Sequence, residues 1–497
     1  MRPQQLTALI TLVAAVILAL CLGISIATEN YALLAFVATI VVICGLVVMP
    51  GYVPLFVFSL LVPFSLPVPF VWDFPVLLIG LGICAVKHWL QGGLRQRGLR
   101  KNGQNFQYHP ATLPMILFMI WAFLRFCLNP SVPNAFGWGA NVTGFRAWLD
   151  YALCFAILFY TGRFIGNRDG LLKTMHWIAY VSVLFIVLFV PLTLSKSTAA
   201  AEFFFRLGMF VTTFENGMLR FVALPVFGLF LIAFLLLPNL MQVGRWARIA
   251  IFAMAFSAII LGGSRTSLAM MLVIVAVIPM LRGKYLQSAI IIGSTVVLSV
   301  SVYLAGPMLS KLPQTSFMRP LALVSPDLTE ASGGDANLEW REVRWQRGLD
   351  QIRKHPLIGV AYGGLENGLV SDIQSEDESQ NLSLATGGVH NAYIACALAL
   401  GIPAAVLFIL ILITQIFTNA ARAIALRKTD PFLAEVHCFV CANLLAIVAA
   451  AFFASDMNDP MIWFMFALGI FTRQLRRQEF KKPAASPVFV QPVLAPA

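Results

Sequence analysis

The chain has 497 residues, of which 59% are apolar and 11% are charged, whereas soluble domains are about half apolar and about a quarter charged. Together with a mean hydropathy of +0.84, this composition excludes a soluble enzyme and indicates a polytopic membrane protein with helical spans. The net charge of +12 does not indicate a nucleic-acid partner, because the basic residues lie in short clusters between apolar runs. We therefore expect an all-α fold with about 12–14 transmembrane helices and one large extracytoplasmic loop.

The N-terminal part of the chain predicts two successive spans, residues 6–27 and 31–48, each close to the roughly 20 residues that cross a hydrocarbon core. The first is expected to be a transmembrane helix rather than a cleaved signal peptide, because its apolar run is too long and a second span follows at once. Five prolines interrupt residues 31–70. This region is therefore either two full spans or one span with a re-entrant segment.

Basic residues recur in clusters that are separated by an even number of spans. This is the positive-inside pattern, which predicts that both chain termini and all the clusters are cytoplasmic. The clusters also predict contacts with anionic membrane lipids. The clusters lie at residues 95–101, 163–173, 245–248, 282–284, 422–428 and 473–482. The segments predicted on the opposite side are residues 128–144, 195–216, 262–264, 307–389 and 455–460.

This map divides the chain into four parts. Residues 1–306 are predicted to be transmembrane helices with short loops, and residues 307–389 a large loop that carries active-site elements. Residues 390–473 are predicted to be C-terminal transmembrane helices, and residues 474–497 a disordered cytoplasmic tail. No internal repeat is visible in the sequence, which disfavours inverted-repeat transporters.

One arginine departs from the charge pattern. Arg265 lies 17 residues after Arg248 and 17 before Arg282, with only uncharged residues between. At ~1.5 Å per helical residue this is about 25 Å each way, which is nearly a full hydrocarbon core. Because both neighbours belong to cytoplasmic clusters, Arg265 is predicted at the opposite membrane face. A cation there is unfavourable unless an anion compensates it.

Two further arginines, Arg206 and Arg220, are predicted near the same face as Arg265, at the start of another span. Three guanidinium groups on one surface are suited to a phosphate-type anion, which they bind through paired N–H donors. The alternative is that each arginine pairs with a carboxylate of the chain. The candidate carboxylates are Glu202, Glu215, Asp456 and Asp459.

His390 is the candidate for proton transfer, since it lies where the polar stretch 307–389 ends and the next apolar span begins. Two glycines precede it, and Asn391 follows it and can orient it. A neutral imidazole can take a proton from a hydroxyl group as a general base. The alternative is an amphiphilic side chain that merely lies at the membrane interface. His355, in a Lys-His-Pro turn, is expected to have a structural role.

The eight cysteines all lie in apolar stretches and are expected to be buried as small hydrophobic side chains. His437, Cys438 and Cys441 superficially resemble a metal-ligand set. They share one predicted helix without a fourth ligand nearby, so we expect no metal site.

Five short motifs follow one another in the second half of the chain. They are Gly263-Ser264-Arg265-Thr266-Ser267-Leu268, Arg341-x-x-x-Trp345, His355-Pro356-Leu357-Ile358-Gly359-Val360-Ala361-Tyr362-Gly363, His390-Asn391-Ala392-Tyr393 and Leu400-Gly401-Ile402. Their order and spacing resemble the O-antigen ligase and Wzy-type polymerase superfamily, over residues 206–412. In that superfamily a short arginine motif in an outer loop precedes a large loop and a histidine at its end.

The resemblance implies a membrane glycosyltransferase that faces the periplasm, with a glycan on undecaprenyl pyrophosphate as donor. His390 would activate the acceptor hydroxyl, and Arg265, with Arg206 or Arg220, would bind the pyrophosphate. The superfamily usually has one upstream arginine followed by Gly and Asn. Arg206 fits that spacing better, whereas Arg220 lies closer to the span, so both remain candidates.

In the same resemblance, Arg341 and Asn391 would support the site, and the reaction would need neither a metal nor another cofactor. The acceptor would be a lipid-linked glycan or the lipid A core, and the location the bacterial inner membrane. The sequence does not distinguish a ligase from a polymerase and does not identify the sugars.

The main alternative is a transporter or flippase of lipid-linked glycans. Such a protein requires ionisable residues near the middle of the bilayer, often with broken helices. The nearest candidates are Asp150 and His176, together with the proline-rich residues 31–70. A purely structural membrane protein would explain neither Arg265 nor His390.

Overall fold

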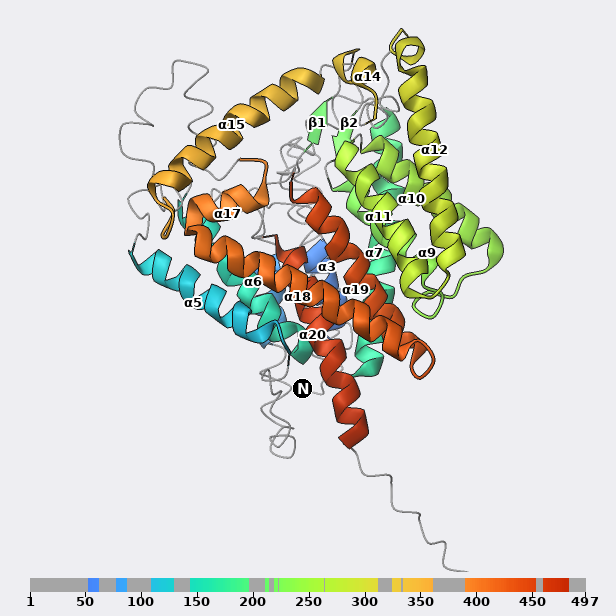
Figure 1. Ribbon diagram of the computed structural model, residues 1–497. Helices are drawn as coiled ribbons and strands as arrows, with labels where there is room; N and C mark the ends of the chain where they lie inside the picture. Colours follow the sequence, from blue (N-terminus) through green and yellow to red (C-terminus); the bar gives the residue numbers. More distant parts are fainter. Residues whose placement is uncertain are drawn as a thin grey trace, which may run out of the picture.

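The computed structural model describes residues 52–61, 77–86, 109–128, 144–195, 211–213, 219–221, 223–262, 264–311, 324–331, 334–360, 389–452 and 459–481. Within these residues every regular element is a helix, except for one hairpin of two three-residue strands (Figure 1). The prediction of an all-α fold is confirmed.

The regular elements follow one another from α3 to α20, and residues Leu77–Val86 are also helical. They are α3 (Val53–Leu61), α5 (Thr112–Leu128), α6 (Gly144–Ile165), α7 (Arg168–Ser195), β1 (Val211–Thr213), β2 (Leu219–Phe221), α9 (Leu224–Leu236), α10 (Arg245–Leu261), α11 (Arg265–Leu281), α12 (Tyr285–Leu309), α14 (Pro326–Ala331), α15 (Gly334–Lys354), α17 (Ala392–Leu400), α18 (Ile402–Leu426), α19 (Pro431–Ala450) and α20 (Pro460–Lys481).

The apolar helices make the chain a multi-pass membrane protein. Among the described residues, the helices α7, α12, α18 and α19 are long and apolar enough to cross a membrane. Shorter apolar helices accompany them, including α5, α9 and α11. The predicted spans at residues 6–27 and 31–48 lie outside the described residues, so the predicted 12–14 spans stay a prediction.

Burial separates central helices from peripheral ones. The most apolar window of α19 is 72% buried, whereas that of α12 is only 11% buried. A helix that is apolar on all sides is buried in protein or exposed to lipid, and these two helices represent the two cases. Helix α19 packs on α11, α18 and α20 in the centre of the bundle.

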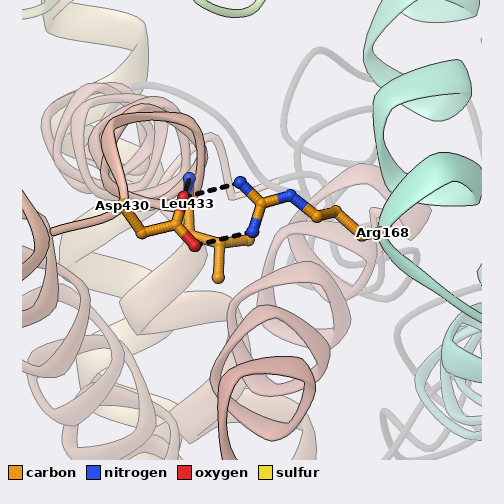
Figure 2. Close-up of polar contacts among 3 residues, drawn as sticks. All are labelled: Arg168, Asp430 and Leu433. Carbon is orange, nitrogen blue, oxygen red and sulfur yellow. Dashed lines mark hydrogen bonds and ion pairs between the residues drawn. The ribbon is translucent and has the colours of Figure 1, made fainter. Parts of the chain in front are cut away.

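Ion pairs join helices at one end of the bundle. The Arg168 guanidinium, at the start of α7, donates to both carboxylate oxygens of Asp430, at 2.7 and 2.8 Å (Figure 2). Asp430 is the N-cap of α19 and also accepts a hydrogen bond from the backbone N–H of Leu433. The pair therefore joins the first turns of α7 and α19.

A second polar group lies at the same end. Glu435 of α19 is 3.4 Å from the Arg282 guanidinium, which follows α11, and accepts hydrogen bonds from Asn239. Arg282 also donates to the carbonyl oxygen of Leu236, the last residue of α9, at 2.7 Å. We call this end, which also carries the basic clusters at residues 245–248, 282–284 and 422–428, the basic end.

The polar loops meet at the opposite end. Helices α11 and α12 pack together and are joined by a short turn at the basic end, so α11 begins and α12 ends at the far side. Helix α14 contacts α12, α15 contacts α14, and the β1–β2 hairpin leads into α9 at the same side (Figure 1). We call this the loop end.

The elements extend past two of the predicted boundaries. Helix α12 continues to Leu309, although the large loop was predicted from Pro307. Helix α20 continues to Lys481, past position 474 where the tail was predicted to begin. Residues 482–497 lie outside the described part of the chain.

Candidate active site at the loop end

The register between α11 and α19 determines how far Arg265 lies from the basic end. The contact between Arg282 and Glu435 aligns the two helices there. Arg265 lies 17 residues before Arg282, and Ala451 lies 16 residues after Glu435. At ~1.5 Å per residue these distances are about 25 and 24 Å. Because the two helices run antiparallel and pack together, Arg265 and Ala451 lie at the same level.

His390 is held at this level by the end of α19. The carbonyl oxygen of Ala451 accepts a hydrogen bond from the backbone N–H of Ala392, at 2.8 Å. The Tyr393 hydroxyl donates to the carbonyl oxygen of Val448, at 3.2 Å. His390 and the N-terminus of α11 therefore lie at the same end of the bundle.

The backbone at His390 is in a rarely occupied conformation. Its φ is 52°, and His390 is the only described residue other than glycine with a positive φ. This left-handed region costs roughly 1–2 kcal/mol for an L-residue. Asn391 stabilises the next turn, because its side-chain oxygen accepts hydrogen bonds from the N–H groups of Tyr393 and Ile394, both at 3.1 Å. Asn391 is therefore a buried helix cap that fixes the direction in which α17 leaves His390.

One face of α15 lies over the histidine. Arg344 and Trp345 lie three and four positions after Arg341, so both are neighbours of Arg341 on one face of the helix. The Trp345 indole N–H donates to the carbonyl oxygen of Val389 at 3.1 Å, immediately before His390. Arg344 is buried, and Arg341 is partly buried. Helix α15 thus brings two guanidinium groups to the histidine.

These surroundings favour the neutral imidazole. Burial lowers the pKa of His390 below its ordinary value, and the positive charges of Arg341 and Arg344 lower it further. Burial also lowers the pKa of Arg344, to about 10, and that of Arg341. Both arginines still carry a proton at neutral pH. The sequence does not by itself show that Arg344 lies beside His390, although the spacing of Arg344 from Arg341 and Trp345 is a signal for it.

The turn after α15 is joined to the α17–α18 junction by backbone hydrogen bonds. Val360 N–H donates to the carbonyl oxygen of Leu398 at 2.7 Å, and Ile402 N–H donates to that of Pro356 at 2.8 Å. His355 itself is exposed at the end of α15. Residues 355–360, the described part of the motif 355–363, therefore meet the motif 400–402 in space, although the two are separate in the sequence.

Two glycines permit this close approach. Gly359 and Gly401 have φ values of 63° and 88°. A Cβ on Gly401 would lie 2.1 Å from the carbonyl oxygen of Leu357, and one on Gly359 would lie 2.5 Å from that of Leu398. Arg125 of α5 donates to the carbonyl oxygen of Gly359 at 3.3 Å. The turn thus fixes the C-terminal end of α15 relative to α17.

Arg265 is the first residue of α11. The Ser264 hydroxyl caps this helix by accepting from the Ser267 N–H at 3.4 Å, and the Arg265 side chain is partly buried. Gly262 lies so close to Pro225 of α9 that a Cβ there would be 2.1 Å from the proline ring. The turn before Arg265 therefore packs on the first turn of α9.

The structure brings Arg220 to the same end as Arg265. Arg220 lies in β2, paired with Thr212 of β1, and β2 leads directly into the first turn of α9. Its side chain is outside the described part of the structure, and Arg206 lies outside it entirely.

Of the four carboxylates considered as partners of these arginines, Glu202, Glu215 and Asp456 also lie outside the described residues. Asp459 lies inside them and accepts a hydrogen bond from the Met461 N–H at 2.8 Å, at the start of α20. Asp459 therefore serves as a capping residue at the loop end.

The residues that a transporter would use lie near helix ends. Asp150 is buried six residues after the start of α6, and His176 is eight residues after the start of α7. At ~1.5 Å per residue these positions are about 9 and 12 Å from the ends. Since α6 begins at the loop end and α7 at the basic end, the two side chains belong to opposite halves of the bundle.

The three residues considered for a metal site lie in the core of the bundle, on α19. The His437 Nδ1 atom is 2.7 Å from the Asn419 side-chain oxygen, between α19 and α18. Cys438 and Cys441 are buried in α19. No group of three or more His, Cys, Asp or Glu side chains in the described residues is arranged to hold a metal ion.

A bundle of apolar helices with a histidine and several arginines gathered at one end defines a multi-pass membrane protein with a cationic site. Residues 249–409 match the model of the O-antigen ligase family, and this segment contains α11, the large loop and His390. The chain therefore carries an O-antigen ligase family domain at residues 249–409. No curated protein matches the chain.

Proposed function

We propose that the protein is a membrane glycosyltransferase that moves a glycan from undecaprenyl pyrophosphate to a sugar hydroxyl at the periplasmic face. The family domain supports this assignment, since O-antigen ligase family proteins are ligase- or polymerase-type membrane enzymes. The observation that carries it is the common level of His390 and Arg265, which follows from the register of α11 and α19. The acceptor hydroxyl that loses its proton must attack the same donor glycan whose pyrophosphate leaves, so both groups are needed at one end.

His390 is the proposed general base. The acceptor hydroxyl gives its proton to the imidazole while its oxygen forms a bond to the anomeric carbon of the donor glycan. The bond between that carbon and the phosphate oxygen breaks, and undecaprenyl pyrophosphate leaves as an anion. Only neutral imidazole can accept this proton, and burial next to Arg341 and Arg344 keeps the pKa of His390 low.

Arg265 is the proposed ligand of the leaving pyrophosphate, together with Arg220 or Arg206. Negative charge grows on the phosphate as the glycosidic bond breaks, and fixed cations stabilise that charge most where water is excluded. A guanidinium group also offers two parallel N–H donors to one phosphate. Because the pyrophosphate already activates the glycan, this reaction needs neither a nucleotide nor a metal.

Helix α15 is proposed to cover the reacting groups. Arg341 and Arg344 add positive charge beside His390, and the Trp345 hydrogen bond to Val389 holds the helix there. Asn391 orients α17 below the histidine. The acceptor is either a second lipid-linked glycan or the lipid A core, and both would approach the same hydroxyl-activating imidazole.

The test is transfer by His390→Ala, with His355→Ala as the matched control. Purified protein would be reconstituted with a lipid-linked donor and acceptor, and the product would be measured on a gel. We expect His390→Ala to lose transfer at unchanged protein level. His355 is exposed at the end of α15, so its variant should retain transfer. Transfer at the normal rate by His390→Ala would refute the proposal.

A further inference from the structure

A cavity lies at the basic end, away from the proposed active site. This cavity, of about 870 Å³, opens between α7 and the connection that joins α9 to α10. Its volume is within the range of roughly 300–1,000 Å³ for sites that hold small organic ligands. The Asn239 N–H at its edge donates to Glu435, which places this edge at the basic end.

The cavity extends over the depth of one membrane leaflet. Its lining along α7 runs from Leu172 to Val187, which is about 22 Å at ~1.5 Å per residue. Half of a bilayer, including its headgroup region, is also about 20–22 Å thick. The length of the cavity therefore matches one lipid molecule that stands upright in its leaflet.

The chemistry of the lining changes with depth. His176 and Asn239 line the part nearer the basic end, Tyr180 lies near the middle, and Leu184 and Val187 line the deeper part. Polar and aromatic side chains are favoured where a bilayer meets water, and aliphatic ones in the hydrocarbon core. This order matches a lipid whose headgroup lies at the basic end and whose acyl chains lie along α7.

Two exposed cations flank the headgroup position. Lys173 is three positions before the lining residue His176 on α7, and Arg248 is three positions before the lining residue Ile251 on α10. Residues three positions apart are neighbours on a helix surface. Both cations thus lie at the edge of the cavity that faces the basic end, one on each wall.

We propose that this cavity binds one anionic phospholipid from the leaflet at the basic end. The headgroup phosphate lies between Lys173 and Arg248, and an acyl chain packs on Leu184 and Val187. The site is separate from His390 and Arg265 and does not depend on the proposed glycosyl transfer. A basic side chain near an anionic lipid surface contributes about fivefold in affinity, so the two together contribute roughly 25-fold.

The experiment is native mass spectrometry of the delipidated full chain in detergent, titrated with phosphatidylglycerol or with phosphatidylcholine. We expect one preferred phosphatidylglycerol adduct, weakened roughly 25-fold in the Lys173→Gln/Arg248→Gln variant. The control variant Lys284→Gln/Lys428→Gln removes the same charge from exposed positions at the same end, and it should bind normally.

A second variant tests the cavity itself. Leu184 is exposed within the cavity, so Leu184→Trp should fill it without disturbing the core and should abolish the preferred adduct. Equal affinity for both lipids, or an unchanged adduct in either cavity variant, would overturn the proposal.

Discussion

Asn391 offers the most direct test of how the fold positions His390. Asn391→Ala removes the side-chain oxygen that accepts from two N–H groups, both at 3.1 Å, at a site that is only 6% exposed. Loss of such a cap costs about 1–2 kcal/mol when it is buried. This free energy lowers the ratio of the capped to the uncapped conformation about 5–30-fold. Because the left-handed backbone of His390 itself costs roughly 1–2 kcal/mol, we expect the uncapped conformation to be populated in the variant. The rate of transfer should then fall by up to the same factor.

The control for this prediction is Asn391→Ser, which keeps a cap acceptor and should retain most of the rate. Rates would be measured with purified protein, a lipid-linked donor and saturating acceptor, next to thermal unfolding in detergent. A normal rate of transfer in Asn391→Ala, or an equal loss in the serine and alanine variants, would mean that the cap does not position His390.

Three further predictions concern charge and orientation. Arg265→Lys keeps the positive charge but loses the two parallel N–H groups of the guanidinium, so the affinity for the lipid-linked donor glycan should fall about 10-fold or more. A normal KM for this substrate would exclude Arg265 from pyrophosphate binding. The base acts only when neutral, so transfer is lost as pH falls through the pKa of His390. Arg344→Gln removes a cation that lowers this pKa, so the acid limb of the pH–rate profile should move to higher pH. An unmoved acid limb would contradict the effect of the Arg344 charge on His390. In intact cells of a cysteine-free variant, an impermeant thiol reagent should label Ser332→Cys but not Lys428→Cys, and the opposite result would reverse the predicted orientation.

The sequence alone determined the class of fold and the end of the bundle at which Arg265 lies. Apolar runs specify helices because no other open backbone structure satisfies its hydrogen bonds in lipid. The spacing of Arg265 from Arg248 and Arg282 predicted its position at the far end, and the register of α11 and α19 agrees. Both inferences depend on residues close together in sequence, where helix geometry converts residue number into distance.

The surroundings of His390 could be predicted only in part. The sequence identified the histidine and Asn391 from their position after the polar stretch, and it included Arg341 through a resemblance. It did not show that Arg344 is buried beside the imidazole, because the two residues are 46 positions apart. That proximity depends on how α15 packs on α17.

Tertiary structure also decided which motifs meet. The residues around Gly359 and Gly401 are joined by backbone hydrogen bonds. No local sequence pattern predicts these bonds, because every residue offers the same backbone groups and the sequence does not show which of them pair. The cavity along α7 has the same origin, because its second wall comes from the α9–α10 connection and α10, some 60 residues later. Hydrophobic periodicity reports which face of a helix is buried, but the partner of that face is set by packing between segments far apart in the chain.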